Sequence, residues 1–247
     1  MALNSLGTTL CSDVVAAALA ALIAAPLVAI IDQATNLNAA GRQKLWPAMG
    51  EKLVDMVRSP MDFLGSPAFQ WLFFVYGITY ASANAAGTIS NALNVNPALP
   101  VLIASTLFNM WFSILKDAAF ARLYGKQDSK DKAMVIPMAS YVAWFFRDII
   151  TMAFVFTIPS LLAGTLPDLW CRLSAPIIAQ YFTTPLHLLA LAMFNLPTAS
   201  IGVKLASVRS AFVPTVLARQ LRILPAFSVA GVANQKARKV ILDFLIR

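Results

Sequence analysis

Long apolar runs separated by short charged segments make up most of the 247-residue sequence. Residues 14–31 carry no charge, and neither do residues 63–115. One membrane crossing needs about 20 residues, so the second run is long enough for two crossings. The polar segment 87–97 divides it with helix-breaking residues. The pattern predicts an all-α membrane protein with six membrane helices, near residues 14–31, 67–88, 98–120, 138–163, 173–196 and 207–231.

The segment between the first two predicted crossings has a different pattern. Leu45, Met49, Leu53 and Met56 recur at helical spacing. The charged residues of this segment occupy other positions: Lys44, Glu51, Lys52, Asp55 and Arg58. This arrangement predicts an amphipathic helix that lies on the membrane surface.

Composition agrees with a membrane protein, because 59% of the residues are apolar and only 12% are charged, against about 25% charged in soluble domains. The net charge of +8 comes from basic residues in loops and at helix ends, which indicates membrane-helix flanks and no nucleic-acid partner. Cys11 and Cys171 are expected to be free thiols, with no metal-ligand spacing. No catalytic motif is present, so we expect no enzyme activity and no cofactor.

Six crossings group into three hairpins, each with a longer basic loop. This organisation resembles the mitochondrial carrier family, in which each odd helix ends in P-x-[DE]-x-x-[KR]. The corresponding positions begin at Pro26, Met110 and Pro185. Two of the three prolines are present, but none of the acidic or basic positions is kept.

The sequence is more similar to a divergent branch of carrier-like mitochondrial proteins. The similarity rests on residues 115–125, Phe146-Arg-Asp148, 156–159, 175–187, 222–227 and Asn234. It implies a carrier-like bundle in the mitochondrial inner membrane, formed by one domain of three repeats, about 1–96, 97–166 and 167–247. By the positive-inside rule the long basic loops face the matrix and both termini face the intermembrane space. Basic loops of this kind could also hold cardiolipin.

Arg147 and Asp148 are ionisable residues inside a predicted crossing, where each needs a partner or water. Arg147 either lines a cavity that binds an anion or a lipid headgroup, or pairs with an acid on a neighbouring helix. Because adjacent helical residues point about 100° apart, we expect Arg147 and Asp148 to find separate partners. His187 either titrates in a cavity or is a neutral histidine hydrogen-bonded across helices.

Arg219 and Arg222 lie i, i+3 on one helix face, where they line a cavity, extend to the surface or hold an acidic lipid. Lys116, Asp117 and Arg122 end the third helix, where a solvated helix end is expected in preference to a gate.

Two functions follow from the resemblance. Loss of the carrier charge motifs favours a transport-degenerate accessory subunit of a respiratory complex or ATP synthase, with the complex's other subunits and membrane lipids as partners. The alternative is an active solute carrier for a small anionic metabolite.

Overall fold

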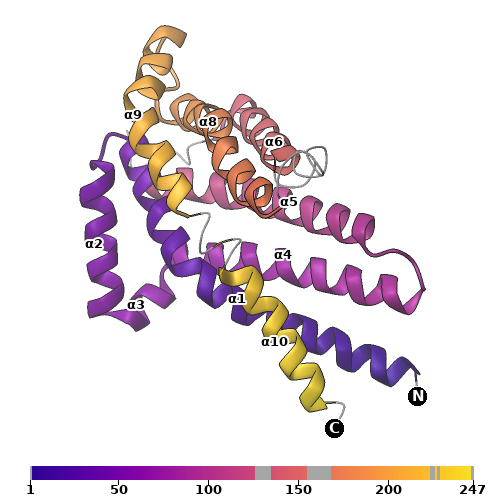
Figure 1. Cartoon of the computed structure of the whole chain (residues 1–247). Coiled ribbons are helices and arrows are strands. Elements are labelled where there is room, and N and C mark those ends of the chain that lie inside the picture. The colour runs from indigo at the N-terminus through magenta and orange to yellow at the C-terminus, as the bar shows by residue number, and fades with distance from the viewer. Residues whose placement is uncertain (1, 126–134, 155–167, 223–225, 227–228, 246–247) are drawn as a thin grey trace. The chain divides into compact units, whose positions relative to one another are not determined.

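The computed structural model describes residues 2–125, 135–154, 168–222, 226 and 229–245. These residues form helices connected by turns and short irregular segments, with no β-strand among them (Figure 1). The helices are α1 (Ala2–Ala39), α2 (Leu45–Arg58), α3 (Pro60–Gly65), α4 (Pro67–Ala92), α5 (Ala98–Tyr124), α6 (Met138–Met152), α8 (Asp168–Asn195), α9 (Ile201–Leu221) and α10 (Ala230–Leu245).

Helix lengths and composition support a membrane protein. Four described helical segments are long and apolar enough to cross a bilayer: Leu6–Ala39, Ala98–Tyr124, Ser174–Asn195 and Ile201–Leu221. Six crossings and three repeats are therefore not confirmed. Of the helix expected over 207–231, α9 covers the first part and has Arg222 as its C-cap, and α10 begins at Ala230. Residues 223–225, 227 and 228 lie outside the described residues. Part of the helix expected over 138–163 lies outside the described residues.

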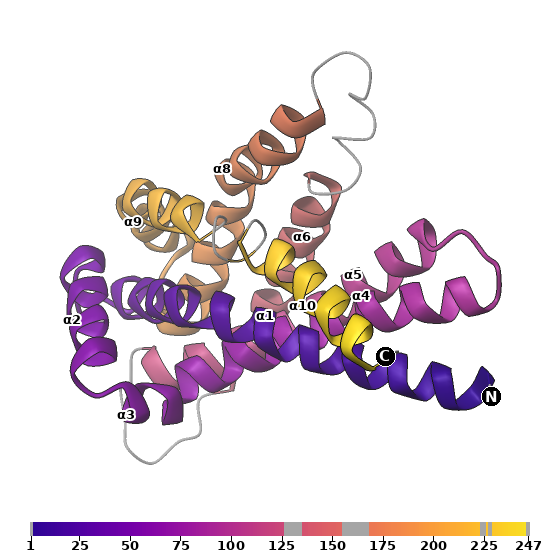
Figure 2. The same cartoon turned by 60° about the horizontal axis from the view of Figure 1, so that its bottom comes forward.

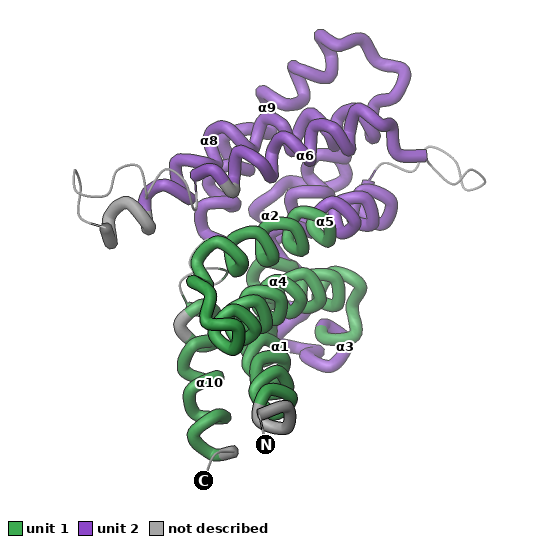
Figure 3. The backbone as a smooth tube through the Cα atoms, turned by 90° about the vertical axis from the view of Figure 1, so that its right-hand side faces the viewer, with its two compact units in different colours: residues 1–29, 64–113, 224–247 green, residues 30–63, 114–223 purple. Residues whose placement is uncertain are grey.

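The chain forms two compact units (Figure 3). Unit 1 contains residues 1–29, 64–113 and 224–247, and unit 2 contains residues 30–63 and 114–223. Helices α1, α3 and α5 contribute residues to both units.

In unit 1, α1 and α4 run antiparallel. Near one end of the pair Thr88 bonds to Asp13, and farther along an added Cβ on Gly77 would lie 3.8 Å from the Cβ of Ala21. The facing part of α1 is rich in buried alanine. Small side chains let membrane helices approach closely, since packing takes the place of the hydrophobic effect there.

The next pair in unit 1 is the expected hairpin, and α4 and α5 begin at residues 67 and 98 as the sequence predicts. Thr79 lies 3.5 Å from Asn109, and the rings of Phe74 and Phe112 meet edge to face. In the turn, Asn94 has a φ of 54°, a conformation that asparagine tolerates better than most residues.

In unit 2, α6 packs against α8, and α8 against α9 (Figures 1 and 2). Helices α6 and α8 are antiparallel, because Ser140 donates to the Ala190 carbonyl and Arg147 contacts His187 farther along the pair. Trp144 and Phe194 are fully buried in the core between these helices and α5.

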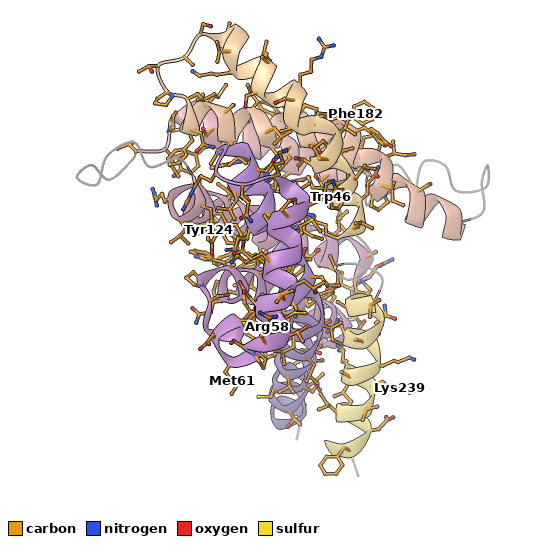
Figure 4. All side chains as sticks on the ribbon, turned by 90° about the vertical axis from the view of Figure 1, so that its left-hand side faces the viewer. Trp46, Arg58, Met61, Tyr124, Phe182 and Lys239 are labelled. Carbon is orange, nitrogen blue, oxygen red and sulfur yellow. The ribbon has the colours of Figure 1, made fainter. Side chains whose placement is uncertain are left out.

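The predicted amphipathic helix is confirmed as α2. Its residues Leu45 and Ala48 are buried in unit 2, while Trp46, Leu53 and Val57 are exposed (Figure 4). Hydrogen bonds from Lys52 and Gln43 hold the pKa of Glu51 below its usual value. Some apolar residues of α2 are therefore buried in the core of unit 2, while others are exposed. The location of α2 on the membrane surface stays a prediction.

Gly125 follows α5 at a position with no room for a side chain. An added Cβ would clash with the Ala121 carbonyl and lie 2.7 Å from the Phe194 ring. We expect Gly125→Ala to lower the free energy of unfolding by about 1–3 kcal/mol, as overpacking does. Thermal unfolding of the detergent-purified protein measures this.

The matched control is Gly50→Ala in α2, where nothing lies within 4 Å of the added Cβ. This change should raise stability by about 0.5–1 kcal/mol, because alanine is the better helix former. Equal effects of the two substitutions would contradict the packing at Gly125.

Candidate functional site

Charged side chains of alternating sign form a continuous series in unit 2, and all of them except the half-buried Arg222 are buried. Lys116 on α5 bridges two carboxylates, since its Nζ lies 2.5 Å from Asp32 Oδ2 and 2.7 Å from Asp117 Oδ1. Arg222 reaches the other oxygen of Asp32 at 2.7 Å. Asp117 also pairs with Arg147, which pairs with Asp148. We call this series the ion-pair chain: Arg222, Asp32, Lys116, Asp117, Arg147 and Asp148.

Arg147 is the most highly bonded member. Its Nε and Nη2 each donate to one oxygen of Asp148 at 2.8 Å, and its Nη1 donates to Asp117. Nη1 also lies 3.1 Å from Nδ1 of His187. An arginine has only donors, so Nδ1 must accept and the proton of a neutral imidazole sits on Nε2.

The ion-pair chain is shielded from solvent, with Asp117 only 1% exposed and Arg147 4% exposed. Pairing offsets the cost of removing these charges from water only when each keeps its partners. The ion-pair chain therefore ties α1, α5, α6 and the end of α9 into one arrangement of unit 2.

The structure tests the sequence expectations for these residues. Arg147 does pair with an acid on a neighbouring helix, Asp117, which confirms the second of the two interpretations of that residue. The expectation that Arg147 and Asp148 find separate partners is wrong, because the long arginine side chain turns back onto its neighbour despite the 100° offset. His187 is hydrogen-bonded across helices.

Three members of the ion-pair chain were not predicted from the sequence: Lys116, Asp117 and Asp32. Lys116 and Asp117 were expected at a solvated helix end, but both are buried because α5 continues to Tyr124 and unit 2 covers it. Asp32 follows the uncharged run 14–31 directly, yet it is buried and accepts from two cations. The sequence signal for Lys116 and Asp117 was that two adjacent opposite charges directly follow the uncharged run 63–115.

Arg219 differs from these paired cations. It is 2% exposed, and its Nε donates to the side-chain oxygen of Gln180 on α8 at 3.0 Å. Among the described residues it makes no salt bridge. Arg222 lies one turn later and is bound to Asp32, so the two arginines predicted on one face have different partners.

Hydroxyl groups without a hydrogen-bond partner lie one helical turn from Arg219 or from Gln180 along the same two helices. Thr215 precedes Arg219 by one turn on α9, and Thr183 and Thr184 follow Gln180 by one turn on α8. All three threonines are fully buried, and their hydroxyls have no hydrogen-bond partner. Buried polar groups without partners are rare and mark places where a ligand or water fits.

Unit 1 contains a second buried cluster that sequence reasoning missed. Asp13 accepts from Thr88 and Arg238, each at 2.5 Å. Asn84 donates to the Asp13 carbonyl and exchanges two hydrogen bonds of 2.9 Å with Asn234. This cluster joins α1, α4 and α10. No described group of three or more His, Cys, Asp or Glu residues could hold a metal ion.

The positions of the carrier motif resemblance fall inside helices. Pro26, Met110 and Pro185 lie within α1, α5 and α8. None of them contributes a charge to the ion-pair chain. The carrier pattern thus has no counterpart in the way this protein pairs its buried charges.

These features define a helical membrane protein with internally paired charges, in which Arg219 is buried without a salt bridge to any described carboxylate. The family model described as "Probable citrulline exporter" matches residues 16–242, so the chain belongs to that family. No curated protein matches the sequence.

The family corrects two expectations. The resemblance to mitochondrial carriers is wrong, because hairpins and helix-kinking prolines are common to many membrane proteins and the diagnostic carrier charges are missing. The accessory-subunit function is also wrong, because the family is one of transporters. Neither a mitochondrial address nor a respiratory partner has support.

Removing Arg147 should leave Asp117 and Asp148 buried without a shared cation. We expect Arg147→Leu to destabilise the protein by about 3–5 kcal/mol. Arg147→Lys should recover part of the loss, since it keeps the charge but not the two-pronged geometry. Thermal unfolding in detergent reports both changes.

The control is Arg209→Leu, at an exposed position on α9. It should change stability by no more than about 0.5 kcal/mol. If Arg147→Leu proves as mild as this control, the ion-pair chain does not hold unit 2 together.

Proposed function

We propose that this protein exports citrulline, or a closely related neutral amino acid, across a membrane. The proposal starts from the family, whose printed description names this activity. Citrulline carries a carboxylate, an ammonium group and an uncharged urea-type side chain. A site for it needs one anion-binding group and several neutral hydrogen-bonding groups.

The observation that carries the proposal is Arg219. A buried guanidinium hydrogen-bonded to a neutral amide leaves its charge uncompensated, which is costly in an apolar helix bundle. The carboxylate of an amino acid would supply the missing negative charge, and arginine binds carboxylates through paired hydrogen bonds. Gln180 would then hold the guanidinium in position through its Nε bond.

Neutral groups for the remainder of the substrate lie on the same two helices. The unpaired hydroxyls of Thr183, Thr184 and Thr215 can donate to or accept from a urea group. Pro185 lacks an N–H, so the carbonyl of Tyr181 loses its usual helical donor and can accept from an ammonium group. The set matches a zwitterion better than a simple anion.

The ion-pair chain has a supporting part in this proposal. Its charges are paired with one another, and they hold α1, α5, α6 and the end of α9 together. We assign Arg147, Asp148, His187 and Arg222 to positioning, and Arg219 to substrate contact. An export function also favours location in the membrane that surrounds the compartment where the substrate is made, and not in the mitochondrial inner membrane.

The six-crossing topology is kept as part of the proposal. Helix α4 has 26 residues without a charge. It runs antiparallel to α1, and α1 is long and apolar enough to cross a bilayer. Helix α6 would supply the sixth crossing. Its two charged residues, Arg147 and Asp148, are neutralised in the ion-pair chain.

Transport by the full chain in proteoliposomes tests the proposal. Vesicles loaded with radiolabelled citrulline should lose it faster than protein-free vesicles, and ornithine, which lacks the carbamoyl group, should leave more slowly. Arg219→Gln should cut citrulline flux by about tenfold or more, because a charge-assisted hydrogen bond contributes about 1.5–3 kcal/mol. The same variant should unfold no earlier than the unmodified protein, since it removes an uncompensated charge.

Arg209→Gln serves as the matched arginine control on α9 and should keep full flux. Citrulline loss no faster than in protein-free vesicles would contradict the export function. Normal flux in Arg219→Gln would leave export standing and remove Arg219 from the substrate site.

A further inference from the structure

A pocket of about 310 Å³ lies in unit 1, between α4 and α10. Its volume is at the lower limit of ligand pockets, about 300–1,000 Å³. Two cationic and two amide side chains line it together with one apolar and one acidic residue: Arg238, Lys239, Asn84, Gln235, Leu242 and Asp243. The lining therefore has a net positive charge and suits a small anionic group.

Arg238 fixes the inner wall of this pocket. Its Nε donates to Asp13 and its Nη2 donates to Thr88, each at 2.5 Å. These bonds hold the guanidinium in one orientation, whereas its side chain stays 29% exposed. A guanidinium has five N–H donors, so donors remain for a ligand in the pocket that Arg238 lines.

Lys239 and Gln235 provide mobile donors from the same helix. Lys239 is exposed on α10 (Figure 4). The rigid arginine and the flexible lysine together form a pair of cations on one wall, the arrangement that phosphate groups favour.

The outer face of α10 indicates where the ligand comes from. Val240 and Phe244 lie one turn apart and are 67% and 79% exposed. A helix with exposed apolar residues on one face and lysines beside them is typical of the membrane interface. Phospholipid phosphates lie at that level of the bilayer, and clustered basic residues there attract acidic lipids.

We propose that this pocket binds the phosphate headgroup of an anionic membrane phospholipid through Arg238 and Lys239. Leu242 contacts the apolar part of the lipid, and Asp243 accepts from a headgroup hydroxyl. The bound phosphate reinforces the Asp13–Arg238 pair and so stabilises the packing of α1, α4 and α10. This site is separate from the proposed substrate contact at Arg219 and goes beyond the export function.

The test uses the full chain in a neutral detergent, titrated with phosphatidylglycerol and followed by native mass spectrometry. Lys239→Gln removes an exposed cation without touching Asp13 or Thr88, so folding is preserved. We expect it to weaken lipid binding by about fivefold, the effect of one lysine near an acidic surface. Phosphatidylcholine, which has no net charge, should bind more weakly to the unmodified protein.

Lys236→Gln is the matched control, because Lys236 is exposed on α10 but does not line the pocket. It should change lipid binding by less than about twofold. Equal losses in both variants would overturn the site in favour of diffuse attraction, and no loss in either would also overturn it. Binding of inorganic phosphate in the same titration, with no binding of phosphatidylglycerol, would overturn the lipid assignment in favour of free phosphate.

Discussion

Charges inside apolar helices must be neutralised, and this constraint shapes both units of the protein. In unit 2 the ion-pair chain alternates in sign from Arg222 to Asp148, so each carboxylate has a cation beside it. In unit 1 the buried acid Asp13 is satisfied by Arg238 and Thr88. An unpaired charge would cost several kcal/mol at such sites, so these contacts decide which helices can lie together.

Helix α1 carries an essential acid for each unit. Asp13 and Asp32 stand at the two ends of its uncharged run, and each is almost completely buried. The charges that delimit an apolar segment in sequence are therefore internal anchors in the structure. Their cations come from distant segments, Arg238 for one and Lys116 and Arg222 for the other. The N-terminal helix thus connects to the C-terminal part of the chain in both units.

Local features of the sequence predicted local structure well. Helix α2, the hairpin of α4 and α5, and the need of Arg147 for a partner followed from periodicity, turn residues and the cost of a buried charge. The partners themselves could not be predicted, because pairing between Asp32 and Arg222 spans 190 residues and leaves no local pattern. Pro26 and Pro185 suggested the wrong family. Prolines that kink helices occur in many membrane proteins, so they specify no family without the neighbouring charges.

The absence of the carrier charge motif favoured a protein that does not transport. That inference assumed that a transporter must be gated by rings of salt bridges. A ligand shifts a conformational equilibrium only through a difference in its affinity for the two states. In the proposed exporter, the empty protein holds an uncompensated cation at Arg219, and the substrate carboxylate neutralises it. Binding would then place a carboxylate beside the Arg219 guanidinium while the ion-pair chain stays closed. A substrate that supplies this local partner can lower the barrier to reorientation, so rings of gating salt bridges are not required.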